Sequence, residues 1–293
     1  MKIATVIVFH QDPVAVERMI KVMTHPSFDF YLHLDKKVDI RPFAYLAKFP
    51  NTYFVDNRKT VRWGGLSQLE AMVSSMNEIL SSGRSYDFIN LLSGQDYPIK
   101  PAGLLYEFFQ QYRGKSFMTC EKAPTPWWDE AMARFTEYHF IDYGFRGRFR
   151  LGKALSALLP GRKFPLPHDL YGGPDAGYWI LSAEAAQYIC TALKRLSKYR
   201  IFFKHTWSPD EFLVSTLLMN SPLKATIIPE NYHYMDRSLG GSHPKILTMK
   251  DYPLLLHSPK FFARKFDRGI DEGLLNRIDE EILFAKSKII RIK

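Results

Sequence analysis

An acidic pair stands where a helix is predicted to begin. The segment 206–216, TWSPDEFLVST, places Asp210 and Glu211 directly after a proline and just ahead of an apolar helical pattern. Ser208 is a suitable N-cap, and the helix dipole favours acids in the first turn, which gives the pair a purely structural explanation. That explanation does not account for the neighbouring Trp207, which suggests the wall of a site. A carboxylate fixed at such a point can accept a proton from a hydroxyl group, so the pair is also a candidate for general base catalysis.

Polar side chains follow two predicted strands. The segment FYLHLDKK ends the first strand, and its two-residue period places His33 and Asp35 on one face. The segment NLLSGQDYPIK sets Asp96 directly after another buried strand. Because open α/β sheets bind ligands at the carboxyl ends of their strands, these groups could meet a ribose, a base or a sugar hydroxyl. The structural alternatives are a strand end that turns into solvent and, for Asp96, an Asx-turn.

Basic residues gather late in the chain. Four of them are Lys245, Lys260, Arg264 and Lys265. They could converge on a diphosphate through charge-assisted hydrogen bonds, or they could form a solvated basic face. The segment 261–266, FFARKF, favours the first interpretation, because its three phenylalanines would anchor the backbone that carries the cations.

Common phosphate-binding and metal-binding motifs are absent from the sequence. It contains neither G-x-G-x-x-G nor G-x-x-x-x-G-K-[ST], and no Asp-x-Asp pair that could hold a divalent metal on a nucleotide-sugar. If the chain uses a nucleotide-sugar, Lys and Arg side chains must therefore neutralise the departing diphosphate.

Predicted strands and helices alternate along the chain and would position these groups. The strand-like segments IATVIVF, FDFYLHLD, YDFINLLS and GYWILS are separated by helix-like segments, with Ser67 and Ser182 as expected N-caps. The alternation predicts an α/β fold with a mainly parallel, doubly wound sheet flanked by helices. The pattern breaks between about 124 and 174. We expect a single domain over 1–293, with that region variable and a basic tail at the C-terminus.

Composition limits the classes of partner. The formal net charge of +10 predicts a surface that attracts polyanions: nucleic acid, acidic lipid headgroups or a phosphorylated substrate. Cys120 and Cys190 fit neither a disulfide framework nor a zinc site, so we expect buried thiols in a reducing cytoplasm. The opening residues MKIATVIVFHQD predict a strand, and no apolar run has the length of a membrane-spanning helix. We expect a soluble protein that is at most peripheral to a membrane.

An ordered series of motifs over about 3–267 resembles glycosyltransferase family 14, which comprises core-2/I-branching β-1,6-N-acetylglucosaminyltransferases and peptide O-xylosyltransferases. The motifs are FYLHLDKK, VRWGGLSQLEAM, NLLSGQDYPI, GYWILS, SPDEFLVST, HPKILT and FARKFD. The resemblance implies a GT-A type fold and an inverting reaction that uses a UDP-sugar, with no divalent metal or other cofactor.

The same resemblance assigns roles to residues. The PDE motif makes Glu211 the catalytic base, and the family's basic pair on the diphosphate falls on Lys265 and Lys245. Branching enzymes have Arg where this chain has Lys245, so the charge is kept and the bidentate geometry is lost. The candidate donor-binding residues are His33, Asp35, Asp96, Lys245, Arg264 and Lys265, and the candidate acceptor-binding residues are Trp127, Trp128, Trp207, Asp210 and Tyr234.

The expected reaction is transfer of GlcNAc or xylose from a UDP-sugar to a hydroxyl of a glycan or lipid-linked glycan acceptor. Without the anchor and disulfides of secretory relatives, the sequence resembles a bacterial cytoplasmic member that builds surface polysaccharide, at the inner face of the membrane. Two alternatives are an inactive sugar-nucleotide-binding relative and a nucleic-acid-binding protein, although recognisable nucleic-acid-binding motifs are missing. The basic stretch 146–163 could contact an anionic membrane or form a solvated loop or helix.

Overall fold

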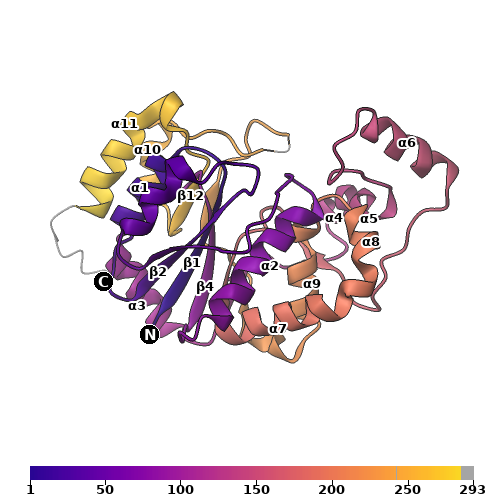
Figure 1. Ribbon diagram of the computed structural model, residues 1–293, viewed down its shortest axis with the longest axis horizontal. Helices are drawn as coiled ribbons and strands as arrows, with labels where there is room; N and C mark the ends of the chain where they lie inside the picture. Colours follow the sequence, from indigo (N-terminus) through magenta and orange to yellow (C-terminus); the bar gives the residue numbers. More distant parts are fainter. Residues whose placement is uncertain (242, 285–293) are drawn as a thin grey trace.

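A seven-stranded sheet separates two helical layers in the computed structural model, which describes residues 1–241 and 243–284 (Figure 1). Its strands are β1 (Ile3–Phe9), β2 (Phe28–Leu34), β3 (Thr52–Phe54), β4 (Phe88–Ser93), β6 (Ser116–Met118), β9 (Trp179–Ser182) and β10 (Ile227–Ile228). Their order is β10-β6-β9-β4-β1-β2-β3, and only β9 runs antiparallel to its neighbours. The mainly parallel α/β sheet flanked by helices, expected from the sequence, is confirmed.

Two smaller sheets lie beside the main one. The first has the order β11-β12-β5, from His233–Met235, Phe262–Arg264 and Asp96–Pro98. The second pairs β7 (Glu121–Lys122) with β8 (Tyr171–Gly172). Because β5 follows β4 closely, the first small sheet brings the late segment 262–264 next to the carboxyl end of β4.

Helices connect the strands and cover the sheet. The α-helices are α1 (Pro13–Val22), α2 (Leu66–Ser81), α3 (Ala102–Gln111), α4 (Pro126–Ala131), α5 (Ala133–Thr136), α6 (Arg148–Leu158), α7 (Ala183–Arg195), α8 (Arg200–Lys204), α9 (Leu213–Met219), α10 (Tyr252–His257) and α11 (Arg268–Ile278). Short 3₁₀ helices are η1 (Arg41–Lys48), η2 (Leu196–Tyr199), η3 (Pro209–Glu211), η4 (Pro222–Thr226) and η5 (Met249–Asp251), and η6 (Asp279–Leu283) is a π-helical turn.

Two hydrophobic clusters fill the space between the sheet and the helices. Along β1, Ile3 and Ile7 belong to the cluster that contains residues of α1, α3, α10 and α11, whereas Ala4 and Val6 belong to the cluster with residues of α2, α7 and α9. This two-residue alternation between two cores is typical of a parallel strand buried on both faces. The faces of the sheet are thus occupied, and polar chemistry is left to its edges and strand ends.

One N-cap predicted from the sequence is confirmed and another is wrong. Ser182 caps α7 by accepting a hydrogen bond from the backbone N of Ala185 at 3.2 Å, as expected. Ser67 is not an N-cap, because α2 begins at Leu66 after Gly65. The Ser67 hydroxyl instead accepts from the backbone N of Arg62 at 2.9 Å and closes the preceding turn.

The irregular region 124–174 contains three helices that the sequence pattern did not show. Two of them, α4 and α5, have 6 and 4 residues, too few for a helical period to stand out. The third, α6, packs through small residues and so has no broad buried apolar stripe. The basic tail proposed for the last residues lies outside the described part of the chain.

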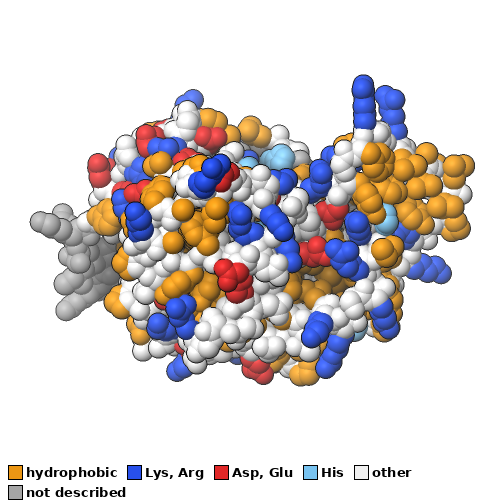
Figure 2. Space-filling view, in the orientation of Figure 1, with side chains coloured by type: hydrophobic (Ala, Val, Ile, Leu, Met, Phe, Trp, Pro, Cys, Tyr) orange, Lys and Arg blue, Asp and Glu red, His pale blue; other side chains and the backbone are white. Residues whose placement is uncertain are grey.

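The two cysteines are free thiols, as expected. Cys190 is buried, which raises its pKa to about 12, whereas Cys120 is only partly buried, so the expected burial is confirmed for Cys190 alone. Lys and Arg side chains are spread over the face seen in Figure 2, with Asp and Glu among them. Within 1–241 and 243–284, no helix has the length and apolar character needed to cross a bilayer.

A close contact between β1 and the end of β4 gives a stability prediction. A Cβ built on Gly94 would lie 2.7 Å from the Cβ of Phe9, so one strand end would have to shift. We expect Gly94→Ala to lower the free energy of unfolding by about 1–3 kcal/mol. Gly103→Ala is the matched control: it lies in α3 with no atom within 4 Å of the new Cβ, and should raise stability by about 0.5–1 kcal/mol. Urea unfolding of both variants checks this, and a neutral Gly94→Ala would contradict it.

Candidate active site

A cavity of about 580 Å³ opens at the carboxyl ends of β1, β2 and β4. The chain leaves β1 toward β2 on one side, while β4 pairs with β1 on the other, so the loops after β1 and β4 diverge. Such a divergence is where open α/β sheets bind ligands. The wall includes the loops at 9–12 and 93–97. The second half of the chain adds Asp175, Gly177, Tyr178, Asp210, Glu211, Met235, Arg237, His243 and Pro244.

The acidic pair reaches this cavity, although not from the first turn of an α-helix. Asp210 and Glu211 line the wall from the 3₁₀ turn η3, and α9 begins only at Leu213. Ser208 has a φ of 45°, and its side chain makes no capping hydrogen bond. The N-cap and helix-dipole explanation from the sequence is therefore wrong, and the pair is placed by a tight turn at the cavity wall.

Arg134 holds the carboxylate of Glu211. The guanidinium group, on α5, forms a hydrogen-bonded ion pair with Glu211, whose side chain is 22% exposed. The rings of Trp127 and Trp207 flank the guanidinium carbon, with centroids at 5.0 and 5.1 Å. These cation–π contacts and the ion pair fix the direction in which the Glu211 carboxylate points. Arg134 was missed because a single Arg in an irregular region carries no sequence signal.

Asp210 lies deeper than its neighbour. It is buried, and Oδ2 accepts a hydrogen bond from Nε2 of Gln68 at 2.9 Å, while Oδ1 has no hydrogen-bond partner among the described residues. Burial, followed by repulsion from Glu211, raises the pKa of Asp210 to about 7. Near neutral pH this carboxyl group therefore holds a proton for much of the time, which an ordinary aspartate does not.

Two predicted donor residues, Asp96 and Arg264, meet in the small sheet beside the cavity. They are paired across β5 and β12, and the Arg264 Nε lies 3.4 Å from Oδ1 of Asp96. Neither atom has a well-aligned hydrogen bond among the described residues, and both residues line the cavity. The Arg264 guanidinium carbon also lies 4.6 Å from the ring centroid of Tyr178. Asp96 further accepts from the backbone N of Ser93, so it stabilises its own loop as well.

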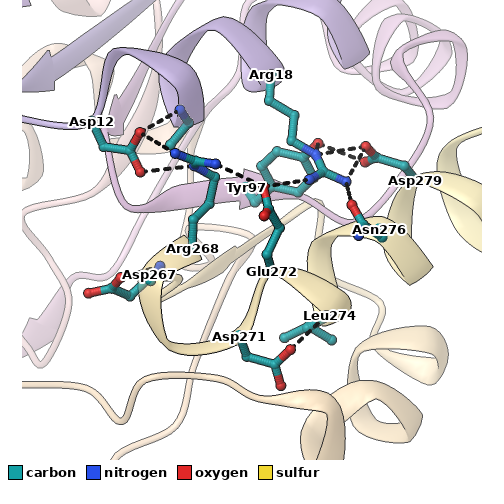
Figure 3. Close-up of polar contacts among 12 residues, drawn as sticks. Asp12, Arg18, Tyr97, Asp267, Arg268, Asp271, Glu272, Leu274, Asn276 and Asp279 are labelled. Carbon is teal, nitrogen blue, oxygen red and sulfur yellow. Dashed lines mark hydrogen bonds and ion pairs between the residues drawn. The ribbon is translucent and has the colours of Figure 1, made fainter.

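Two more guanidinium groups line the cavity, and the sequence did not indicate either. Arg237 forms an ion pair with Asp175. Arg268 donates from Nε to Oδ2 of Asp12 at 3.1 Å and from Nη1 to Oε1 of Glu272 at 2.8 Å (Figure 3). Asp12 in turn caps α1 by accepting from the backbone N of Ala15 at 3.0 Å.

A second polar cluster holds the C-terminal end of α11 next to α1. Arg18 donates from Nε to Oδ2 of Asp279 at 2.8 Å and from Nη2 to the side-chain oxygen of Asn276 at 2.8 Å (Figure 3). The hydroxyl of Tyr97 also donates to Asp279, at 2.7 Å. These contacts fix the C-terminal end of α11, the helix whose first residue, Arg268, lies at the cavity.

The predicted convergence of four late cations is not observed. Lys245 donates to Oδ1 of Asp251 at 2.6 Å, and Lys260 forms an ion pair with Glu230, so local carboxylates hold both. Lys265 is partly buried and does not line the cavity, and burial and the nearby Arg264 lower its pKa. Of the four, only Arg264 reaches the cavity wall.

In the strand-end motif FYLHLDKK, Asp35 lies at the cavity and His33 lies in the core. Asp35 lines the cavity and accepts from the backbone N of Lys37 at 2.9 Å. His33 is fully buried and is not on the wall, since its Nε2 accepts from the backbone N of Lys59 at 3.0 Å. Burial lowers the pKa of His33 to about 4, so the ring is neutral at physiological pH and is part of the structural support.

The aromatic residues predicted to bind the acceptor do not line the cavity wall. Trp128 is 1% exposed and belongs to the core, which corrects its assignment to the acceptor. Trp127 and Trp207 stand behind Glu211 around Arg134, and Tyr234 is partly buried on β11. The wall instead carries Trp63, which is 51% exposed. Its ring lies 4.5 Å from that of His243, another wall residue, between ring centroids.

Comparisons show which known proteins this chain is similar to. The family model described as "Branch: Core-2/I-Branching enzyme" matches residues 3–255. The chain is 28% identical over 293 residues to Xylosyltransferase oxt of Drosophila pseudoobscura pseudoobscura, covering 90% of this chain and 31% of that protein. It is 26% identical over 305 residues to Xylosyltransferase 1 of Rattus norvegicus, covering 95% of this chain and 35% of that protein. The chain thus spans about a third of the length of these relatives.

Among solved structures, the apo form of mouse xyloside xylosyltransferase 1 aligns with a TM-score of 0.41 at 11% identity. The alignment covers 90% of this chain and 97% of the mouse chain. The family-model match begins at the first residue of β1 and ends within α10, so it includes the acidic pair and most of the cavity wall.

The raised pKa of Asp210 predicts a pH-dependent stability. Between about pH 4 and about pH 7 the folded protein keeps a proton on Asp210 that the unfolded chain has released, so stability falls as pH rises through this range. Asp210→Asn removes that proton uptake. We expect the stability of the variant relative to wild type to increase over the same range, by an amount on the order of 1–4 kcal/mol. Denaturant unfolding at several pH values measures this difference.

The exposed Glu130 supplies the control for this measurement. Glu130→Gln should follow the wild-type stability at every pH, because its carboxylate is in solvent in both states. A constant difference between Asp210→Asn and wild type across the range would show that Asp210 titrates normally.

Proposed function

Because the chain belongs to the Core-2/I-Branching enzyme family, we propose that it is a glycosyltransferase that moves a sugar from a UDP-sugar to a hydroxyl group of a glycan acceptor. The observation that carries this proposal is the cavity at the sheet edge, where a clamped glutamate and three guanidinium groups share one wall. The names of the two relatives compared above support xylose as the transferred sugar, and GlcNAc is the alternative offered by the family resemblance. Surface polysaccharide is the acceptor class we propose.

The reaction we propose is a single in-line displacement with inversion at the anomeric carbon. Glu211 removes the proton from the acceptor hydroxyl, and the oxygen forms a bond to the anomeric carbon as the bond to UDP breaks. The electron pair of the broken bond leaves with the diphosphate, and the proton stays on the glutamate. A positioned base of this kind contributes about 10²–10⁴ in rate.

Arg134 acts on this reaction as a positioning residue. It does not line the cavity, and it contacts the carboxylate from behind while Trp127 and Trp207 hold its guanidinium plane. One carboxylate oxygen of Glu211 is thus engaged with Arg134, and the other is available to an acceptor hydroxyl. This arrangement pre-organises the base, so little reorganisation is needed when the acceptor binds.

Guanidinium groups on the wall are suited to hold the diphosphate. Arg237, Arg264 and Arg268 line the same cavity, and each is kept in place by a carboxylate, respectively Asp175, Asp96 and Asp12. Arginine can bind phosphate oxygens bidentately and stabilise the charge that develops on the leaving group. We therefore propose that these three groups do the work that a divalent metal does in many nucleotide-sugar enzymes.

Glu211→Gln tests the base. The substitution keeps the shape of the side chain and removes its basicity, so kcat should fall by about 10²–10⁴. Binding of the UDP-sugar, followed as protection against thermal unfolding, should remain. Glu130→Gln, at an exposed position outside the cavity, is the control and should turn over at the wild-type rate. Turnover by Glu211→Gln close to wild type would overturn the assignment, and a wild-type chain that binds donor without releasing UDP would indicate an inactive relative.

Arg264→Gln tests the cation site. Loss of one charge-assisted contact should weaken UDP binding by roughly 10- to 100-fold, from about 1.5–3 kcal/mol per contact. Arg195→Gln, on the exposed surface of α7, should leave the affinity unchanged. Isothermal titration with UDP gives both values, and the thermal unfolding of each unliganded variant confirms its fold. Transfer activity that is lost in EDTA and restored by Mn²⁺ would contradict the proposal that cations replace the metal.

A further inference from the structure

Helix α6 stands out from the rest of the molecule and packs through a narrow inner face (Figure 1). Gly152 and Ser156, one turn apart, form that face. A Cβ at Gly152 would lie 2.5 Å from the backbone oxygen of Tyr138, and the Ser156 hydroxyl accepts from the backbone N of Tyr138 at 2.9 Å. Only small residues allow such close packing, so nearly all larger side chains of α6 are left on the outside.

The outer face of α6 is apolar. Leu151, Ala154 and Leu158 follow the i, i+3, i+7 spacing of one helix stripe, opposite the inner face, and all are exposed. Leu158 is 81% exposed and Phe149 is 59% exposed. Figure 2 shows hydrophobic side chains gathered at the end of the molecule where Figure 1 places α6. We call this surface the α6 patch; its apolar members are Phe145, Phe149, Leu151, Ala154, Leu158 and Leu159.

Positively charged side chains, with no acidic side chain among them, border the α6 patch. Residues 143–168 contain six Lys or Arg and no Asp or Glu. Arg162 is not available, because its guanidinium group is partly buried and donates to backbone oxygens including that of Glu137 at 2.8 Å, which fixes the chain after α6. Lys and Arg side chains project beside the apolar side chains in Figure 2. The exposed cations are Arg146, Arg150, Lys153 and Lys163.

We propose that the α6 patch docks on an anionic lipid surface, with its leucines and phenylalanines among the acyl chains and its cations at the headgroups. An apolar helix face bordered by Lys and Arg has the chemistry of an interfacial membrane helix. A second copy of this chain fits less well, because a symmetric contact would place the two sets of cations against each other. A nucleic acid would neutralise the cations but leave Leu151 and Leu158 exposed.

The connection between α5 and α6 ties this surface to the active site. Asp142, within the connection, accepts a hydrogen bond from the backbone N of Ser67 at 3.2 Å, at the start of α2. Arg134, which holds Glu211, lies on α5 just before it. Docking through α6 would thus bring the cavity beside the lipid surface and supply a lipid-linked acceptor. This extension rests on the proposed function, whereas docking itself does not.

Vesicle co-sedimentation of the full chain tests the docking. Vesicles of phosphatidylcholine mixed with phosphatidylglycerol should bind the wild type, and vesicles of phosphatidylcholine alone should bind it much less. The double variant Arg150→Gln, Lys153→Gln should lower the partition coefficient by roughly fivefold for each cation. Leu158→Ser with Phe149→Ser should also reduce binding, because the apolar contact is lost. UDP binding should remain in all of these variants, since none lies at the cavity.

Matched substitutions elsewhere on the surface separate the α6 patch from general charge. Lys48→Gln with Arg195→Gln removes two exposed cations from η1 and α7, and Leu254→Ser removes a 55% exposed leucine from α10. Both controls should bind anionic vesicles as the wild type does. The proposal would be overturned if the controls lost as much vesicle binding as the α6 variants, or if both α6 variants bound vesicles as well as the wild type. It would also be overturned if the wild type did not bind anionic vesicles. A further outcome against the proposal is a wild-type dimer in sedimentation velocity, together with a monomeric Leu158→Ser, Phe149→Ser variant.

Discussion

A charge removed from water needs a partner, and this constraint shapes the whole wall of the cavity. Glu211 is held by Arg134, and Arg264 lies against Asp96. Arg268 is fixed by Asp12, which also caps the helix after β1. Each functional group is thus positioned by an opposite charge on another element before a ligand arrives. A bound diphosphate would meet guanidinium groups that are already oriented, so binding requires an exchange of partners and little movement of the backbone.

The sheet explains why these groups collect at one edge. Strands β1, β2 and β4 are buried on both faces between two hydrophobic clusters, so charged groups are placed where those strands end. The small sheet of β11, β12 and β5 then brings the chain at 262–264 beside the end of β4, although more than half of the sequence separates them. Tertiary pairing of that kind creates the guanidinium side of the cavity from residues distant in sequence.

Groups at strand ends could be predicted from the sequence, whereas groups brought in by tertiary pairing could not. Strand limits and the positions of Asp35 and Asp96 at the cavity follow from local periodicity, because parallel strands share one carboxyl edge. Glu211 follows no strand and lies on a tight turn, and only the family resemblance singled it out as the base. Local pattern could not show that Asp251 holds Lys245 away from the cavity, or that Arg134 would approach Glu211 across 77 positions. The N-cap at Ser208 failed for a related reason, since the fold requires a tight turn there and overrides the capping preference.

Adjacent residues in that turn have different environments, which bears on which one serves as base. Asp210 is buried, which raises its pKa to about 7, and Gln68 donates a hydrogen bond to it. Glu211 lines the cavity, partly exposed and paired with the guanidinium group of Arg134. A general base must lie within reach of the acceptor hydroxyl, and the Glu211 carboxylate on the cavity wall meets that condition. Asp210, often protonated at neutral pH, is suited instead to donate a hydrogen bond and to limit the negative charge beside the base. Burial of the first acid therefore assigns the chemistry to the second.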